Sequence, residues 1–163
     1  KLIAIEGAVG SLSRLNWGLS EKKGADSAGK SEEKNSYSSL RRYEDREREG
    51  LKSFVPGTIF KVELDNTHPM AFGYPDYYYT MKQDSRMYEF LKSGWNVGVI
   101  KRDNQVAGFV GSSLKSKLKD GMIFGAQPLG GGQIIYLADN ILFRNFWENG
   151  KLLFCNALFM VGN

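Results

Sequence analysis

The chain contains one histidine, His68, and one cysteine, Cys155, among its 163 residues. A protein zinc site needs three or four ligands, drawn mostly from these two residue types, and an intrachain disulfide needs two cysteines. The fold therefore depends on a hydrophobic core, which a single domain of this length can build. Cys155 lies in an apolar stretch and is predicted to be a small buried hydrophobic residue. We expect no metal ion and no cofactor in this chain.

The charge balance is mildly basic, with 22 Lys+Arg against 18 Asp+Glu and a net charge of +4. This bias is too small to indicate a nucleic-acid partner. The longest apolar stretches, such as residues 152–161, are too short to span a bilayer. Residues 1–8 already read as an apolar strand with no signal peptide before it. We expect one domain over residues 1–163, excised from a longer protein and lacking strands upstream of Lys1.

Residues 20–53 carry almost no apolar side chains, and both signs of charge alternate along them. Such a segment cannot bury enough apolar surface to offset the entropy cost of ordering it. We interpret residues 20–38 as a mobile polar insertion and residues 40–51 as a polar helix. An arginine-rich docking arm is the alternative.

The order of the elements predicts an α/β domain. An apolar strand over residues 1–8 leads through glycines into a helix over residues 11–19, and such a βα unit is typical of parallel sheets. The later segments mix strands with helices: a strand at 58–64, helices at 84–92 and 112–119, hairpins at 96–101/105–111 and 121–127/132–138, and a mostly buried helix at 141–160 broken near residues 149–150.

The best candidate site is the turn that follows strand 58–64. It contains Asp65, Asn66, Thr67 and His68, and α/β folds place binding groups at strand ends of this kind. His68 with Asp65 could form the base of a hydrolase, provided that a nucleophile or an activated water lies nearby. The structural alternative is that Asp65 and Thr67 hydrogen-bond the turn backbone and that Pro69 fixes its exit.

Two further residues follow the last predicted strand. Asp139 closes that strand and can cap the next helix, and Arg144 can pair with Asp139 or with another acidic group. The functional alternative is that both bind a carboxylate or a sugar. The consecutive tyrosines Tyr77, Tyr78 and Tyr79 cannot all face one core, so at least one is expected at the surface, where it can contact a partner.

The stretch from Arg41 to Gly162 resembles a known family. The segments RRYEDREREG, VPGTIFKVELDNTHPMAFGYPD, VAGFVG, GGGQIIYLADNILFRNFW and KLLFCNALFM are similar to the C-terminal portion of secreted bacterial zinc carboxypeptidase-like proteins. In these proteins a peptidase domain is followed by a domain that resembles class I glutamine amidotransferases. The resemblance implies a flavodoxin-like, three-layer fold with a mixed, mainly parallel sheet and C-terminal hairpins.

The resemblance also implies that the active residues of both enzymes are missing. The peptidase's His-x-x-Glu does not occur here, so zinc is expected only in the peptidase domain of the parent protein. The amidotransferase pattern needs a cysteine at the strand-to-helix elbow and a His-Pro-Glu, where this chain has Ala8 and His68-Pro69-Met70.

The domain is therefore expected to be a non-catalytic accessory domain. Its implied partners are the peptidase domain of the same polypeptide and a peptide or glycan substrate, in the periplasm or outside the cell. Two alternatives stay open. One is a divergent hydrolase using His68 and Asp65, and the other is an independent small-ligand or glycan-binding module using the 65–68 turn with Asp139 and Arg144.

Overall fold

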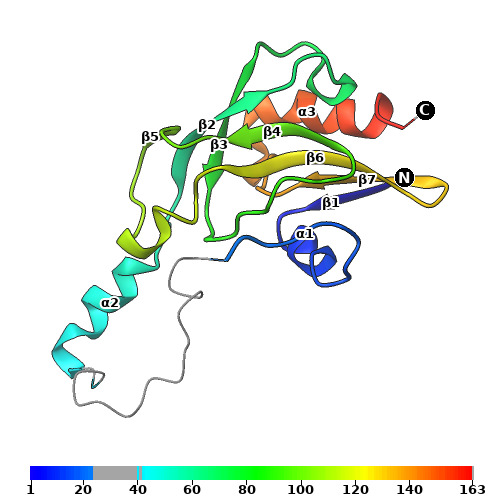
Figure 1. Cartoon of the computed structure of the whole chain (residues 1–163). Helices are drawn as coiled ribbons and strands as arrows, with labels where there is room; N and C mark the ends of the chain where they lie inside the picture. The colour runs from blue at the N-terminus through cyan, green and yellow to red at the C-terminus, as the bar shows by residue number, and fades with distance from the viewer. Residues whose placement is uncertain (24–39, 41, 163) are drawn as a thin grey trace.

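A computed structural model describes residues 1–23, 40 and 42–162. These residues contain seven strands and three α-helices (Figure 1): β1 Leu2–Ile5, α1 Gly7–Leu12, α2 Arg46–Lys52, β2 Thr58–Leu64, β3 Tyr77–Lys82, β4 Trp95–Ile100, β5 Gln105–Ala107, β6 Gly121–Leu129, β7 Gly132–Leu137 and α3 Glu148–Phe159. Single 3-10 turns lie at Tyr43–Asp45, Pro69–Ala71, Ser112–Leu114 and Phe143–Asn145.

All the strands belong to one sheet, in the order β1-β7-β6-β4-β2-β3, with β5 also paired to β2. The α/β class with a mixed sheet is therefore confirmed. The expectation of a mainly parallel sheet is wrong, because within the described ranges only β1 and β7 pair in parallel and all the other pairs are antiparallel. The connections explain this result: a tight turn such as that between β6 and β7 joins antiparallel strands, whereas parallel neighbours need a long crossover.

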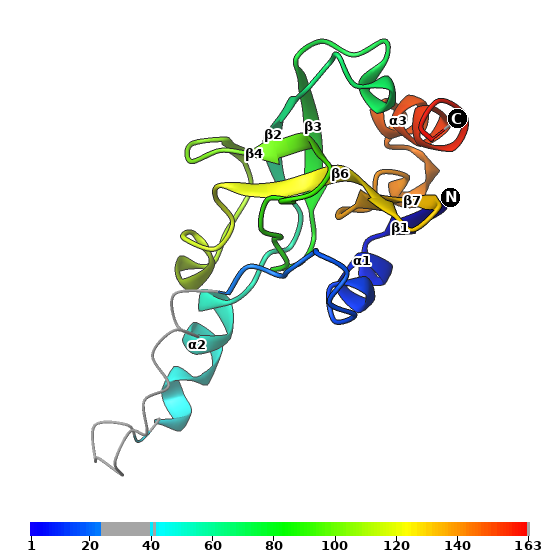
Figure 2. The same cartoon turned by 45° about the vertical axis from the view of Figure 1, so that its right-hand side comes forward.

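The helices cover only part of the sheet. Figure 2 shows α1 on one side of the β1–β7 ribbon and α3 on the other, while α2 projects away from the sheet. The side chain of Asn156 fastens α3 to the segment after β2, since its Nδ2 donates to the carbonyls of Met70 at 3.1 Å and Phe72 at 2.7 Å.

Two predicted elements are wrong because long-range pairing overrides local preference. Residues 84–92 do not form a helix: Asp84 accepts the backbone N–H of Arg86 at 3.0 Å, and Tyr88 bridges to both Glu21 and Met122. Residues 105–111 do not form a hairpin with β4, because β5 pairs with β2 instead.

The predicted helix boundaries also shift. The first helix begins at Gly7 rather than at residue 11, and the 112–119 segment forms only a 3-10 turn at its start. The last helix begins at Glu148, because Arg144 and Asn145 adopt left-handed backbone angles with φ of 49° and 58°. The predicted break at residues 149–150 is therefore wrong, since both lie inside α3.

The first residues of the predicted polar insertion are anchored to the rest of the domain by hydrogen bonds. The N–H of Glu89 donates to the carbonyl of Ser20 at 2.9 Å, and that of Lys22 donates to Met87 at 2.7 Å, so residues 20–22 are tied to the segment before β4. Nearly all of the remaining insertion, residues 24–38, lies outside the described residues. The predicted polar helix is found in shorter form as α2.

Candidate functional site

A groove of about 340 Å³ lies beside the turn that the sequence singled out. Four parts of the chain meet there: the segment after β2, the first residue of β4, strand β7 and the segment after α3. The groove is lined by Asp65, Thr67, His68, Pro69, Trp95, Gln133, Val161 and Gly162. Asn66 is exposed in the same turn but is outside this lining.

Asp65 shapes the turn, as the structural alternative predicted. Its Oδ1 accepts the backbone N–H of Thr67 at 3.1 Å and the hydroxyl of the same residue. The N–H of Asp65 donates to the carbonyl of Val97 in β4 at 2.8 Å, which joins the turn to the sheet. Within the described part of the chain, Oδ2 has no hydrogen-bond donor, so this oxygen is available to a ligand.

The ring of His68 is arranged to donate a hydrogen bond to a ligand through Nε2 rather than to act as a base. Its Nδ1 accepts the backbone N–H of Met70 at 3.1 Å. Burial lowers the pKa of His68, and the nearby charge of Asp65 opposes that effect without reversing it. The ring is therefore neutral at pH 7 with its proton on Nε2, because Nδ1 is used as an acceptor. A base would need a free lone pair, so this geometry does not favour the hydrolase alternative, which stays a prediction.

Trp95 was not singled out by the sequence reasoning, yet it is the largest side chain of the groove. It is 60% exposed, and its ring centroid lies 6.4 Å from that of His68 at an interplanar angle of 50°. Trp95 follows Gly94, whose φ of +126° turns the chain into β4. The one sequence feature that could have pointed to Trp95 as a site residue is its position directly after a turn glycine. Gln133 in β7 gave none, because only pairing with its neighbours brings it to the groove.

Asp139 lies elsewhere, in a buried charge cluster. Its Oδ1 accepts Lys82 Nζ at 2.8 Å, and its Oδ2 accepts the Thr80 hydroxyl at 2.7 Å. Lys82 is fully buried and also contacts Asp84 at 3.3 Å. Burial opposes the charged form of Lys82, but the two carboxylates outweigh burial and raise its pKa. Asp139 is thus a structural partner of Lys82.

Arg144 does not join the predicted ligand set. Its guanidinium lies 5.1 Å from the ring centre of Phe143, and Asp139 pairs with Lys82 instead. The contacts of the described residues thus separate Asp139 and Arg144 from the 65–68 turn. Cys155 is exposed, so the prediction of a buried thiol is wrong: α3 turns this position away from the core.

The strand-to-helix elbow is centred on Glu6, not on Ala8. Glu6 has φ 51° and ψ −114°, a strained conformation for a residue other than glycine, whereas Ala8 lies inside α1. The cavity that Glu6 shares with Asp84 and Asp139 has a volume of about 10 Å³. A cavity needs about 10–15 Å³ to hold a single water molecule, so this cavity has no room for a substrate.

Comparison with protein-family models, curated proteins and solved structures found no match to this chain. Among the described residues, no three His, Cys, Asp or Glu side chains form a group that could hold a metal ion. None of the helices in the described ranges has the length and apolar character needed to cross a membrane.

Proposed function

We propose that this chain is a non-catalytic binding domain that holds a glycan in the groove beside Trp95. The observation that carries the proposal is the exposed indole ring of Trp95 next to polar groups of opposite hydrogen-bonding character. Asp65 offers a free acceptor, Oδ2, and neutral His68 carries a donor on Nε2. Sugar hydroxyls both donate and accept, and the C–H face of a pyranose packs on an aromatic ring.

The size and charge of the groove agree with this ligand. A groove volume of about 340 Å³ lies within the range of small-ligand sites, which suits a ligand of one or two sugar units. Among the described residues, Asp65 is the only charged side chain that lines it when His68 is neutral. A peptide would also need partners for its backbone along an open strand edge, and the groove lies across strand ends and turns.

We also propose that the domain accompanies a zinc carboxypeptidase-like peptidase domain outside the cytoplasm and assists its substrate binding. The support is the resemblance of the five segments quoted above. The surface available for such packing includes Tyr77 and Tyr79, which are 38% and 40% exposed and pack edge to face on β3, while Tyr78 between them is buried. An amidotransferase-like origin is supported only locally, by the β1–α1 turn at Glu6 and the parallel β1–β7 pair.

The test is calorimetric titration of the chain with neutral oligosaccharides and, separately, with unstructured peptides. We expect saturable binding of an oligosaccharide that Trp95→Ala weakens by about tenfold or more, because a stacked aromatic ring is lost. Trp17→Ala is the matched control, since Trp17 is also exposed, at 37%, but does not line the groove.

Two outcomes would overturn the proposal. Equal loss of binding in the two tryptophan variants would show that the groove is not the site. Hydrolysis of glutamine or of a peptide by the chain, abolished by His68→Ala, would show instead that the hydrolase alternative is correct.

A further inference from the structure

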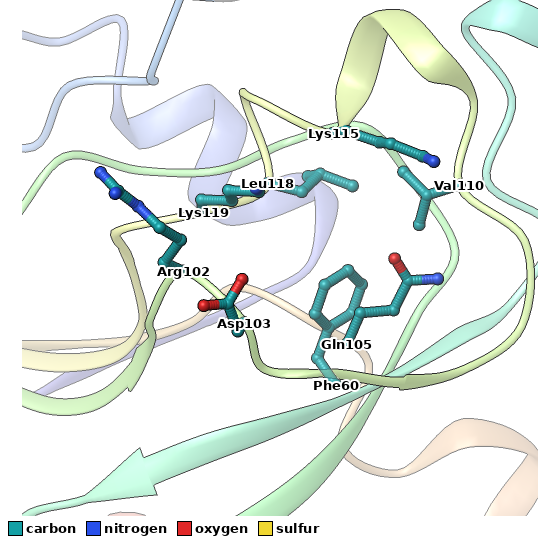
Figure 3. Close-up of a pocket in the computed structure, with 8 residues that line it drawn as sticks. All are labelled: Phe60, Arg102, Asp103, Gln105, Val110, Lys115, Leu118 and Lys119. Atoms are coloured by element: carbon teal, nitrogen blue, oxygen red, sulfur yellow. The ribbon is translucent and has the colours of Figure 1, made fainter.

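A second pocket, of about 240 Å³, lies between the β4–β5 turn and the segment that follows β5 (Figure 3). It is lined by Phe60, Arg102, Asp103, Gln105, Val110, Lys115, Leu118 and Lys119. None of these residues lines the groove beside Trp95. The inference drawn from this pocket does not depend on the proposed glycan site.

The floor of the pocket is apolar and belongs to the core. Phe60, Val110 and Leu118 are 4%, 5% and 1% exposed. Figure 3 shows the ring of Phe60 between Asp103 and Gln105, with Lys115 and Lys119 on the wall formed by the later segment. A ligand that enters the pocket therefore meets an aromatic ring and two aliphatic side chains beneath a charged rim.

The rim carries three cations and one carboxylate, so its net charge is positive. Arg102, Lys115 and Lys119 have no ion-pair partner among the described residues, and Asp103 is the one acidic residue of the lining. Two cations close to them in the sequence do form ion pairs: Lys101 pairs with Glu63, and Lys117 pairs with Glu21. Of these five neighbouring cations, the three without a carboxylate partner are thus the ones that line the pocket.

We propose that this pocket binds a small organic carboxylate with an apolar body. The rim cations Arg102, Lys115 and Lys119 would supply the positive charge that holds the carboxylate, and the apolar body would pack on Phe60. The pocket volume of about 240 Å³ is close to the lower end of the range for small-ligand sites, which suits a small molecule and excludes a folded partner. Inorganic phosphate would use the cations but leave the apolar floor empty, so the floor favours the organic acid.

The experiment is a titration of the ¹⁵N-labelled chain followed by NMR, with phenylacetate as the probe. Phenylacetamide tests the need for charge, acetate tests the need for the apolar body, and inorganic phosphate tests simple anion binding. We expect phenylacetate to bind in the millimolar range or tighter, to shift the signals of residues 102–105 and 115–119, and to leave the indole N–H of Trp95 unmoved. The other three compounds should bind at least about tenfold more weakly.

Matched variants test which cations of the rim hold the carboxylate. Lys115→Gln and Lys119→Gln should each weaken phenylacetate binding by about tenfold, the loss of one charge-assisted hydrogen bond. Lys101→Gln is the control, because Lys101 lies beside the pocket but does not line it. Asp103→Asn should tighten binding, since it removes a like charge from the rim. Raising the salt concentration should weaken binding to the native chain.

The proposal is overturned if phenylacetamide or phosphate binds as well as phenylacetate, or if the shifts lie elsewhere. It is also overturned if no saturable binding occurs in the millimolar range, or if Lys101→Gln loses as much affinity as the pocket variants. Each of these outcomes leaves the glycan groove unaffected, because the two sites share no lining residue.

Discussion

Replacing Lys82 with methionine should be one of the most damaging single changes to the stability of this fold. Methionine retains the length and apolar stem of the side chain but removes the charge. Asp139, only 5% exposed, would then keep the Thr80 hydroxyl as its one described partner. Removing one partner of a buried ion pair typically costs about 3–5 kcal/mol, because it leaves the other charge uncompensated.

The structure predicts which of the two single variants, Asp139→Asn and Lys82→Met, is the less stable. After Asp139→Asn, Lys82 still has the carboxylate of Asp84 at 3.3 Å. After Lys82→Met, no cation is left in contact with Asp139 among the described residues. We therefore expect Asp139→Asn to lower the free energy of unfolding by about 3 kcal/mol and Lys82→Met to lower it by about 5 kcal/mol. The double variant should cost less than the sum, since the two changes remove one shared interaction.

The assay is urea unfolding at pH 7, followed by circular dichroism. Lys151→Met is the matched control, because Lys151 makes a 2.7 Å ion pair with Glu148 on the surface, where such pairs contribute about 0–1 kcal/mol. A total stability of about 5–15 kcal/mol is usual for a domain, so Asp139→Asn is expected to remain folded and measurable even if Lys82→Met is not. The reasoning is refuted if Lys82→Met costs no more than Lys151→Met, or if the costs of the two single changes simply add.

The same pair predicts a pH dependence. The pKa of Lys82 is raised in the folded state, so its contribution to stability is fully present below the unfolded value of about 10.4. That contribution is lost as the pH rises through the higher folded value. The difference in unfolding free energy between the native chain and Lys82→Met should therefore shrink above about pH 10.5. A constant difference up to pH 12 would contradict this assignment.

Three further predictions concern single residues. The only imidazole NMR signal of the chain, from His68, should titrate below the ordinary value of about 6.5 and should show the Nε2–H tautomer; a midpoint above 6.5 would contradict the burial of this ring. Gly150→Ala should lower the midpoint of thermal unfolding sharply, because a Cβ there would lie 1.7 Å from the carbonyl oxygen of Ile141. Gly50 has open space around it, so Gly50→Ala should instead stabilise the exposed helix α2 by about 0.5–1 kcal/mol. Tyr88→Phe should be neutral or stabilising in urea unfolding, since the buried hydroxyl of Tyr88 has no partner among the described residues, and a loss of more than about 1 kcal/mol would reveal one.

Local signals in the sequence predicted the parts of the fold that local chemistry controls. The alternating apolar residues of 58–64 coincide with β2, and the glycine-rich turn after residue 129 joins β6 and β7 as an antiparallel hairpin. The Asp65–Thr67 turn also forms as predicted, because a carboxylate two residues before an N–H closes such a turn without help from the rest of the chain.

The failures occur where a distant segment competes with a local preference. Residues 84–92 have a helical composition, yet Tyr88 is placed between Glu21 and Met122 by extended pairing on both sides. The Tyr77–Tyr79 run was recognised as partly surface-exposed, which the structure confirms, but its role as the edge strand β3 was missed. In the candidate groove, Trp95 and Gln133 were missed because each lies far along the chain from the turn that it adjoins.

The sequence by itself determined which kinds of stabilisation are open to this protein. One cysteine excludes an intrachain disulfide in any fold, and the period of the apolar residues identified β2, β6 and β7 as strands. Only the tertiary structure decided how the strands pair and which charges are buried. Lys82 and Asp139 are 57 positions apart, and their 2.8 Å contact arises from the arrangement of the whole sheet. The physical reason is range: turn and strand preferences act over a few residues, whereas the pairing of a buried charge depends on every segment that excludes water from it.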